Sequence, residues 1–145
     1  MSDEQTIGER MNDEQTIDFI LARPGTIAVV GLSPSPARTS HRVSLFMQSH
    51  GWRIVPVNPN AEEALGEKAY PSLAEAARHE RIDIVNCFRK SEDIPPIVDD
   101  AIASGAKVLW MQLGITNEAA AARARAAGMT VVQDRCIKVE QAARL

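Results

Sequence analysis

The sequence predicts an α/β fold built on a single doubly wound parallel sheet of five strands, with helices on both faces. Short apolar, β-branched runs alternate with stretches of helical apolar spacing from residue 27 to the end of the chain. The central runs are apolar along their length, as burial on both faces requires. Gly51, Gly105 and Gly128 each follow a helical stretch, where glycine commonly ends a helix. The expected strand order is 3-2-1-4-5.

The N-terminal half predicts two of these strands. Residues 1–11 are polar and are predicted to be a flexible segment preceding a domain over 12–145. Asn12 is the expected cap of a first helix, which covers an end of the sheet and stops before Pro24. The elements that follow are a strand over 27–31, a helix over 38–50, a strand over 53–57, a loop over 60–71 and a helix from the Ser72 cap to residue 79.

The C-terminal half continues the alternation. Pro95 and Pro96 fit only in the first turn of a helix, where their missing N–H groups are not needed. Thr116 is the expected cap of an alanine-rich helix that closes at Gly128. The predicted elements are a strand over 82–88, a helix within 92–103, a strand over 107–111, the alanine-rich helix, a strand over 129–133 and a short tail to residue 145.

Composition excludes several classes of protein. The 145 residues suffice for one domain, and the net charge of −3 gives no general affinity for nucleic acid or anionic membranes. No apolar run is long enough to span a membrane and no signal-peptide core is seen, so a cytoplasmic location is expected. Cys87 and Cys136 make neither a disulfide framework nor a metal site.

Polar residues and glycines collect after the predicted strands. In doubly wound sheets ligands bind at the carboxyl edge, so these residues are the candidate site. Helix-start N–H groups attract phosphate, and Arg38, Thr39 and Ser40 add charge and hydroxyl donors there. The residues that follow the strands are Gly31, Leu32 and Ser33 after the first, Asn58 and Pro59 after the second, Phe88 and Arg89 after the third, and Gln112 and Gly114 after the fourth.

The loop after the first strand departs from the dinucleotide fingerprint Gly-x-Gly-x-x-Gly. Gly31 matches its first position, whereas Ser33 and Pro36 occupy the other two glycine positions. The second strand ends in Asn58-Pro59 rather than in the acidic residue that binds a ribose. These departures argue against standard NAD binding and favour a phosphate-bearing ligand that approaches the backbone less closely.

Six segments carry a resemblance to a known family. The chain resembles the small stand-alone CoA-binding proteins related to the succinyl-CoA synthetase α-subunit, over roughly residues 15–140. The resemblance implies a Rossmann-like domain that binds coenzyme A or an acyl-CoA as a sensor, carrier or regulatory module, with no catalytic residue. Asn60 stands where a lysine often follows Asn-Pro in the family. The matching segments are 29–33, 57–59, 66–73, 87–92, 110–114 and 134–138.

Each candidate residue also has a purely structural interpretation. Gly31 is either a phosphate-loop glycine or an ordinary strand-end turn, and Ser40 either donates to a phosphate or caps the helix. Arg38 is either a diphosphate counter-charge or a solvated arginine. His41 is a conceivable phosphoryl acceptor, but a solvent-facing or ligand-flanking histidine is favoured because no acid/base partner is nearby.

Two other functions remain open from the sequence. One is a small NAD(P)-binding redox or redox-sensing domain. The other is an acyltransferase or thioesterase that uses Cys136, which lies between Arg135 and Lys138. The expected partner is a small-molecule nucleotide ligand, with neither nucleic acid nor membrane. A homodimer or a protein partner is also possible. The alanine-rich helix (119–127) either forms a dimer face or packs on the sheet.

Overall fold

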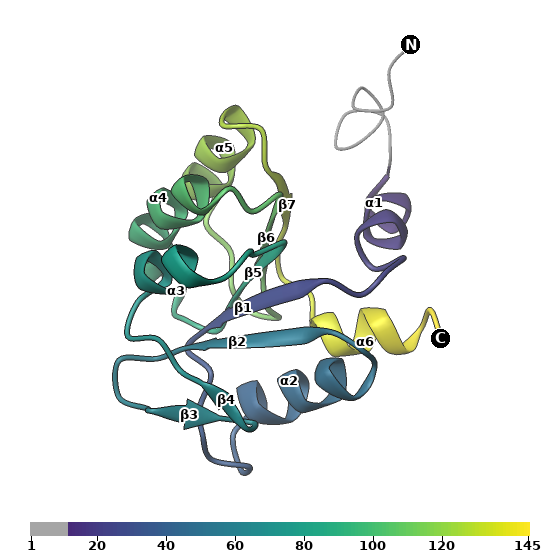
Figure 1. Cartoon of the computed structure of the whole chain (residues 1–145). Helices are drawn as coiled ribbons and strands as arrows, with labels where there is room; N and C mark the ends of the chain where they lie inside the picture. The colour runs from purple at the N-terminus through teal and green to yellow at the C-terminus, as the bar shows by residue number, and fades with distance from the viewer. Residues whose placement is uncertain (1–11) are drawn as a thin grey trace.

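Five parallel strands form the central sheet of the computed structural model, which describes residues 12–145 (Figure 1). Every neighbouring pair of strands runs parallel, in the order β2-β1-β5-β6-β7. This confirms the predicted α/β class and the doubly wound parallel sheet. The strands are β1 (Thr26–Val30), β2 (Arg53–Val57), β5 (Ile84–Cys87), β6 (Val108–Met111) and β7 (Thr130–Val132).

The predicted strand order 3-2-1-4-5 is wrong. Counted along the chain, the order is 2-1-3-4-5, so β2 lies at an edge and β1 pairs with both β2 and β5. The position of Pro56 fits this order. On the side away from β1, β2 makes only an isolated parallel bridge, between Val57 and Tyr70, in which the Pro56 carbonyl accepts from the Tyr70 N–H. Proline has no N–H for a second neighbouring strand and is confined to edges. The strand order therefore reverses between β1 and β5.

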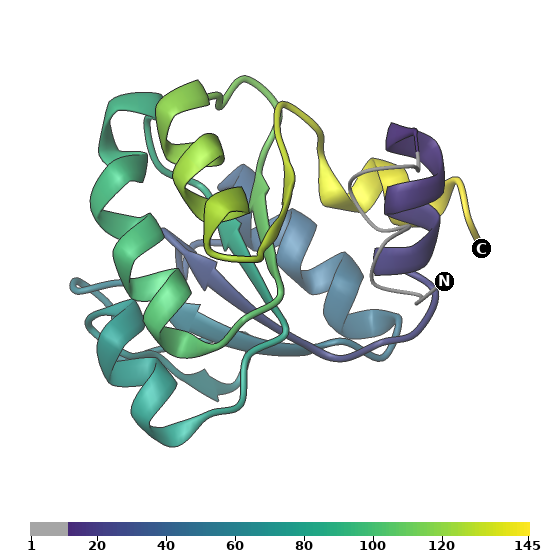
Figure 2. The same ribbon diagram turned by 90° about the horizontal axis from the view of Figure 1, so that it is seen from above.

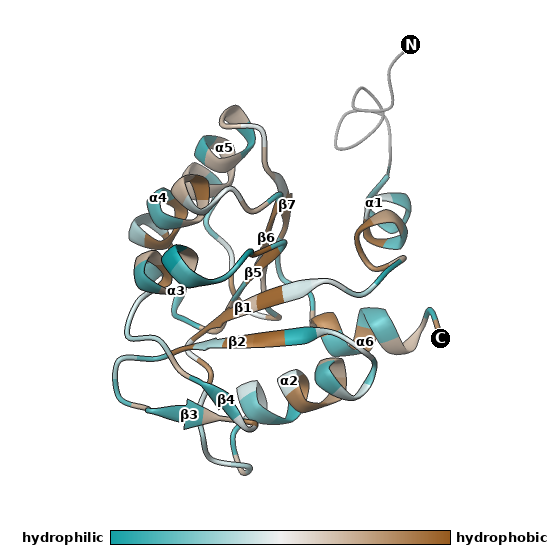
Figure 3. Ribbon diagram, viewed as in Figure 1, coloured by the Kyte–Doolittle hydropathy of each residue, from teal (hydrophilic) through white to brown (hydrophobic). Residues whose placement is uncertain are grey.

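Among residues 12–145, three helices contribute to the core on each face of the sheet, and Figures 1 and 2 show the two layers of helices. Side chains alternate along every strand: Ala28 and Val30 join one core, whereas Ile27 and Val29 join the other. Figure 3 shows the hydrophobic colour concentrated along the strands. One face carries α3 (Leu73–His79), α4 (Ile94–Ser104) and α5 (Glu118–Ala126), and the other carries α1 (Asp13–Ile20), α2 (Thr39–Ser49) and α6 (Ile137–Ala142).

Three local features differ from expectation. The predicted loop over 60–71 contains a short antiparallel hairpin of β3 (Glu63–Ala64) and β4 (Glu67–Lys68). The cap of α5 is Asn117 rather than Thr116, since the Asn117 side chain accepts from the Ala120 N–H at 3.0 Å. The predicted tail contains α6, whose first N–H is held by the Gln112 side chain at 3.0 Å. The hairpin pairs residues within the predicted loop itself, the α5 cap differs by one residue, and the start of α6 depends on Gln112, which is distant in sequence.

Other local predictions are confirmed. Asn12 caps α1 through a reciprocal capping box with Gln15. Ser72 caps α3, and Pro95 and Pro96 lie in the first turn of α4, which follows a 3-10 turn η2 (Ser91–Asp93). The alanine-rich helix packs on the sheet, because Ala120, Ala121 and Ala124 are buried in the core.

Helix α1 is attached to α6 by ion pairs. Arg144 binds Asp18 at 2.7 Å and Glu14 at 2.8 Å, and Arg135 binds Glu14 at 2.8 Å. Hydrogen bonds from Arg135 and Arg144 lower the pKa of Glu14 below its ordinary value. Ile17 and Leu21 complete the attachment by entering the core beneath α1. The predicted flexible segment 1–11 lies outside the described residues, among which no helix is long and apolar enough to cross a membrane.

Candidate functional site

The loop leaving β1 lies against the end of β5. Gly31 has a φ of +92°, and its N–H donates to the Val57 carbonyl at 2.8 Å. A Cβ added to Gly31 would lie 2.6 Å from the Phe88 carbonyl oxygen, a distance that backbone atoms do not tolerate. Glycine is therefore required here for the close packing of β1 on β5, whether or not a ligand is also present.

Side chains hold the next residues of this loop. The Asn58 amide Nδ2 donates to the Leu32 carbonyl at 2.9 Å, and its Oδ1 accepts from the Asn60 N–H. Leu32 itself is fully buried, whereas Pro59 is exposed. Asn58 thus joins the end of β2 to the loop after β1, and both polar ends of its side chain are already engaged by the protein.

Ser33 is held on both sides by the first turn of α2. Its N–H donates to Ser40 Oγ at 3.0 Å, and its carbonyl accepts from His41 Nδ1 at 3.0 Å. Ser40 and His41 are both buried. The solvent-facing half of the expectation for His41 is wrong, and the ligand-flanking half stays a prediction. Burial beside a loop carbonyl leaves a phosphoryl-acceptor role without support. Ser40 neither caps α2 in the usual way nor points freely to solvent.

The start of α2 carries no side-chain cap. Arg38 occupies the cap position, is exposed and offers no acceptor oxygen, and the first turn contains no acidic residue. The leading N–H groups of a helix have no partner within it, so those of Thr39 and Ser40 face outward from the helix end. The Thr39 hydroxyl accepts from Arg42 Nη2 at 3.3 Å. This arrangement leaves positive charge and backbone donors at the carboxyl edge of β1.

Among residues 12–145, the N-terminal ends of the other α-helices have their N–H groups bonded by the protein or removed by prolines. Asn12, Ser72 and Asn117 cap α1, α3 and α5 through side-chain oxygens. Pro95 and Pro96 remove two N–H groups from the first turn of α4, and the Ile94 N–H donates to the Ser91 carbonyl. Gln112 accepts from the first N–H of α6. Helix α2 therefore differs from its neighbours in having neither a capping side chain nor prolines at its first positions.

Phe88 and Arg89 follow β5, immediately beside the β1 loop. The Phe88 N–H donates to the Val30 carbonyl at 2.9 Å, and its half-buried ring packs on the core beneath α2. The Arg89 stem would lie 3.1 Å from a Cβ at Gly31, and its guanidinium is 3.8 Å from Asp93. The corrected strand order makes these two residues direct neighbours of Gly31, which the expected order did not.

Gln112 and Gly114 belong to a closed part of the same edge. The buried Gln112 holds α6, and the Gly114 N–H donates to Asp134 Oδ1 at 2.6 Å. Asp134 has a φ of +59°, and its own N–H donates to the Ile115 carbonyl. Sequence reasoning did not identify Asp134 as a loop-closing residue, although a positive-φ aspartate after a strand is a known turn former.

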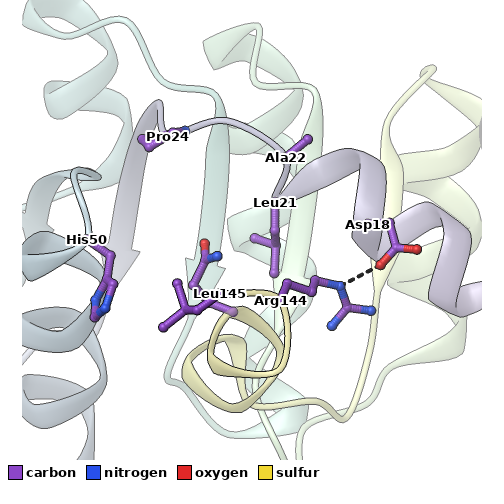
Figure 4. A pocket seen from close by; sticks show the side chains of 8 residues that line it. Asp18, Leu21, Ala22, Pro24, His50, Arg144 and Leu145 are labelled. Carbon is purple, nitrogen blue, oxygen red and sulfur yellow. Dashed lines mark hydrogen bonds and ion pairs between the residues drawn. The ribbon is translucent and has the colours of Figure 1, made fainter.

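A cavity of about 440 Å³ lies at the opposite edge of the sheet, between α1, the end of α2 and the end of α6 (Figure 4). None of the predicted site residues lines it, and Arg144 within it is paired with Asp18. The cavity is lined by Asp18, Leu21, Ala22, Pro24, His50, Gln141, Arg144 and Leu145.

The two cysteines differ in environment. Cys87 is completely buried, and this burial raises the pKa of its thiol to about 12. Cys136 is half-buried at the start of α6, where its carbonyl accepts from the Glu140 N–H. The thiol of Cys87 is therefore unavailable as a thiolate, as its interpretation as a small apolar core residue requires.

Known proteins resemble this chain over most of its length. The YneT protein of Bacillus subtilis (strain 168) is 50% identical over 126 residues, which cover 87% of this chain and 92% of the relative. A solved structure from Pyrococcus horikoshii OT3 is 36% identical, with a TM-score of 0.86 and 94% of each chain covered. The ADP-forming acetate–CoA ligase II of Archaeoglobus fulgidus is 27% identical over 105 residues, and the matched region spans only 15% of that ligase.

A family model also matches most of this chain. The model of a family described as a CoA binding domain matches residues 25–142, from the turn before β1 to the end of α6. The match includes every strand of the central sheet and every loop at its carboxyl edge. The chain belongs to this CoA binding domain family.

Proposed function

We propose that this protein binds coenzyme A or an acyl-CoA at the carboxyl edge of its sheet and acts there as a sensor, carrier or regulatory module without chemistry of its own. The family match over residues 25–142 and the likeness to a CoA ligase support a CoA-type ligand. The proposal covers free CoA and its acylated forms alike.

The open start of α2 is the observation that carries the proposal. It lies after β1, beside the point where the strand order reverses, which is where doubly wound sheets bind their ligands. Helix-start N–H groups and the helix dipole attract phosphate, and an arginine adds strong charge-assisted hydrogen bonds. The proposal therefore places the diphosphate of CoA at Thr39 and Ser40, with Arg38 as its counter-charge.

The remaining predicted residues form the surroundings of this phosphate site in the proposal. Ser33, Phe88 and Arg89 border the β1 side, where the Arg89 guanidinium is half-exposed. Gln112 and Gly114 shape the rim toward β6, with the strongly exposed Leu113 between them, 70% accessible. This rim is assigned to the pantetheine or acyl end of the ligand.

An NAD(P)-dependent role is less well supported by the same loops. Asn58 stands where a ribose-binding carboxylate would follow the second strand, and its side chain is already bonded to Leu32 and Asn60. The Phe88 carbonyl lies against Gly31, so the side of Gly31 on which a Cβ would lie is closed to a ligand. The cytoplasmic location stays a prediction, a homodimer or a protein partner stays a possibility that the sequence leaves open, and an enzyme that uses Cys136 stays an untested alternative to this proposal.

Titration calorimetry with CoA, acetyl-CoA, NAD⁺ and NADP⁺ tests the proposal. We expect heat with CoA or acetyl-CoA and none with either dinucleotide at the same concentrations. Arg38→Gln should weaken CoA binding about tenfold, because hydrogen bonds to charged groups contribute about 1.5 kcal/mol. Arg23→Gln is the control, since it removes the same charge from the loop before β1 at the opposite edge. Binding of NAD⁺ in preference to CoA would overturn the proposal.

A further inference from the structure

The loop over residues 33–38 is exposed but not loosely built. Pro34 through Arg38 are exposed, so hydrophobic packing does not hold this segment. Its backbone is instead wound in successive short turns: the Ser35 N–H donates to Ser33 Oγ at 3.1 Å, and the Arg38 N–H to the Ser35 carbonyl at 3.1 Å. Pro34 and Pro36 restrict the same backbone further. A surface loop this restrained is ordered by local hydrogen bonds rather than by burial.

Side chains of α2 hold the loop at two places. Near its C-terminal end the Arg42 guanidinium donates to the Ala37 carbonyl, and at its N-terminal end the anchor is Ser33. Ser40 Oγ accepts from its N–H and His41 Nδ1 donates to its carbonyl, each at 3.0 Å. We call these two side chains the Ser33 clamp. Both are buried, Ser40 at 7% and His41 at 9% exposure, so water competes weakly for either bond.

His41 must carry its proton on Nδ1, because a carbonyl oxygen only accepts. The imidazole therefore serves as a fixed donor to the loop and is not free to act as a base through that nitrogen. His50, the residue that directly follows the same helix, makes the corresponding Nδ1 bond to the Phe46 carbonyl at 2.8 Å, away from the loop. The two histidines thus make the same kind of bond at opposite ends of α2.

We infer that His41 is a positioning residue for ligand binding: by holding Ser33 it fixes the loop over residues 33–38 beside the open start of α2 before any ligand arrives. This inference rests on the proposed function, in which the diphosphate of a CoA-type ligand occupies that helix start. Holding a loop in its binding conformation in advance removes the entropy cost of ordering it on binding. His41 then controls affinity without touching the ligand.

Three substitutions of His41 separate its hydrogen bond from its volume. His41→Asn retains a donor at the position of Nδ1, His41→Gln moves the donor one bond further out, and His41→Leu fills the space with no donor. His50→Leu is the matched control for loss of a histidine bond at the other end of the helix. For each protein, amide hydrogen exchange in the ligand-free state, CoA affinity by calorimetry and the thermal unfolding midpoint are measured.

The inference predicts that the Ser33, Ser35 and Arg38 amides of the ligand-free wild type are protected from exchange. His41→Leu and His41→Gln should lose this protection and bind CoA about fivefold more weakly, as expected for one intramolecular hydrogen bond. His41→Asn should restore both properties, and His50→Leu should change neither. A midpoint lowered equally in His41→Asn and His41→Leu, with unequal CoA affinities, would show that the affinity follows the donor rather than stability.

Two results would overturn the inference. Wild-type affinity and exchange in His41→Leu would show that the clamp is dispensable, and equally weak binding by His41→Asn and His41→Leu would show that ring shape matters rather than the donor. Neither result touches the proposed function, which requires only that the wild type bind CoA. A wild type that binds no CoA would instead refute the proposed function, while the exchange data would still show whether the clamp orders the loop.

Discussion

Helices α2 and α5 both begin at the carboxyl edge of the sheet, yet their first turns are built in opposite ways. Asn117 caps α5, Glu118 adds an acidic residue to its first turn, and the Asn117 N–H is bonded to Gln133. Helix α2 begins with Arg38, has no side-chain cap and has no acidic residue in its first turn. The start of α5 is thus satisfied by the protein itself, whereas the start of α2 is left positive.

Under the proposed function, this difference separates a helix start that the protein itself satisfies from one that is left open for a ligand. A capping side chain contributes about 1 kcal/mol to a helix, so an uncapped helix forgoes stability that one substitution would supply. Helix α2 nevertheless has its loop tied down by Ser40, His41 and Asn58. An ordered loop beside an unsatisfied helix end is the arrangement expected of a prepared anion site.

The largest expected effect is a loss of stability on substituting Gly31, which precedes α2, compared with Gly114, which precedes α5. Gly31→Ala should lower the free energy of unfolding by about 3 kcal/mol, since its Cβ would meet a backbone oxygen at 2.6 Å in a positive-φ conformation. Gly114→Ala should lower it by only about 1 kcal/mol, because open space surrounds Gly114 and the penalty comes from its positive φ alone. Urea denaturation measures both, and equal losses would contradict the close packing of β1 on β5.

The second prediction concerns a substitution that gives α2 a capping side chain, as α5 has. Arg38→Asp should raise the free energy of unfolding by about 1 kcal/mol, because a carboxylate at the cap accepts from the helix-start N–H groups. The same carboxylate occupies those donors and repels phosphate, so CoA affinity should fall about 30-fold, or roughly 2 kcal/mol. Thermal unfolding and calorimetry on one preparation check the two changes. A variant that is stabilised and still binds CoA with wild-type affinity would remove α2 from the site.

The third prediction concerns a substitution that removes the capping side chain of α5. Asn117→Ala should destabilise the protein by about 1 kcal/mol through loss of the cap to Ala120. CoA affinity should stay at the wild-type value, since the α5 end is closed and is not assigned a ligand contact. A large loss of CoA binding here, at unchanged stability, would mean that the ligand contacts both helix starts.

The smallest effect lies at the outer edge of β2, remote from both helix starts. Burial alone would raise the pKa of Glu80, but hydrogen bonds from Arg53 and Tyr70, each 2.9 Å long, lower it overall. A carboxyl whose pKa is lower in the folded state stabilises the fold above its unfolded pKa. That stabilisation is lost as the pH falls through the folded pKa.

Glu80→Gln should therefore lower stability at neutral pH by less than about 1 kcal/mol and flatten its decline in acid. Unfolding midpoints measured from neutral to acidic pH test this expectation. CoA affinity at neutral pH should not change. A steeper acid decline in the variant than in the wild type would assign the acid sensitivity to another carboxyl.

The parts of the fold that depend on local pattern could be predicted from the sequence. The apolar run of β1, the Asn12 cap and the prolines of α4 each act within one turn or strand. The alternation of strands and helices along the chain does not determine the strand order, because the orders 3-2-1-4-5 and 2-1-3-4-5 both bury the same apolar strands. Pro56 was the available signal, since a proline in the second strand favours an edge position.

The candidate site was predictable by position but not by role. Residues that follow the strands do lie along one edge, because parallel strands end together. The sequence did not show that Ser40 and Asn58 bond to the β1 loop, or that His41 is buried. Those roles depend on contacts between the β1 loop, the first turn of α2 and the end of β2, which residue types do not determine.

The position of the CoA diphosphate is best tested by a crystal structure of the protein with CoA. We expect diphosphate oxygens within hydrogen-bonding distance of the Thr39 and Ser40 N–H groups and of the Arg38 guanidinium. We also expect the loop over residues 33–38 to keep its ligand-free conformation. CoA bound with its phosphates at the opposite edge, in the cavity between α1 and α6, or a start of α2 left empty at saturating CoA, would contradict this expectation.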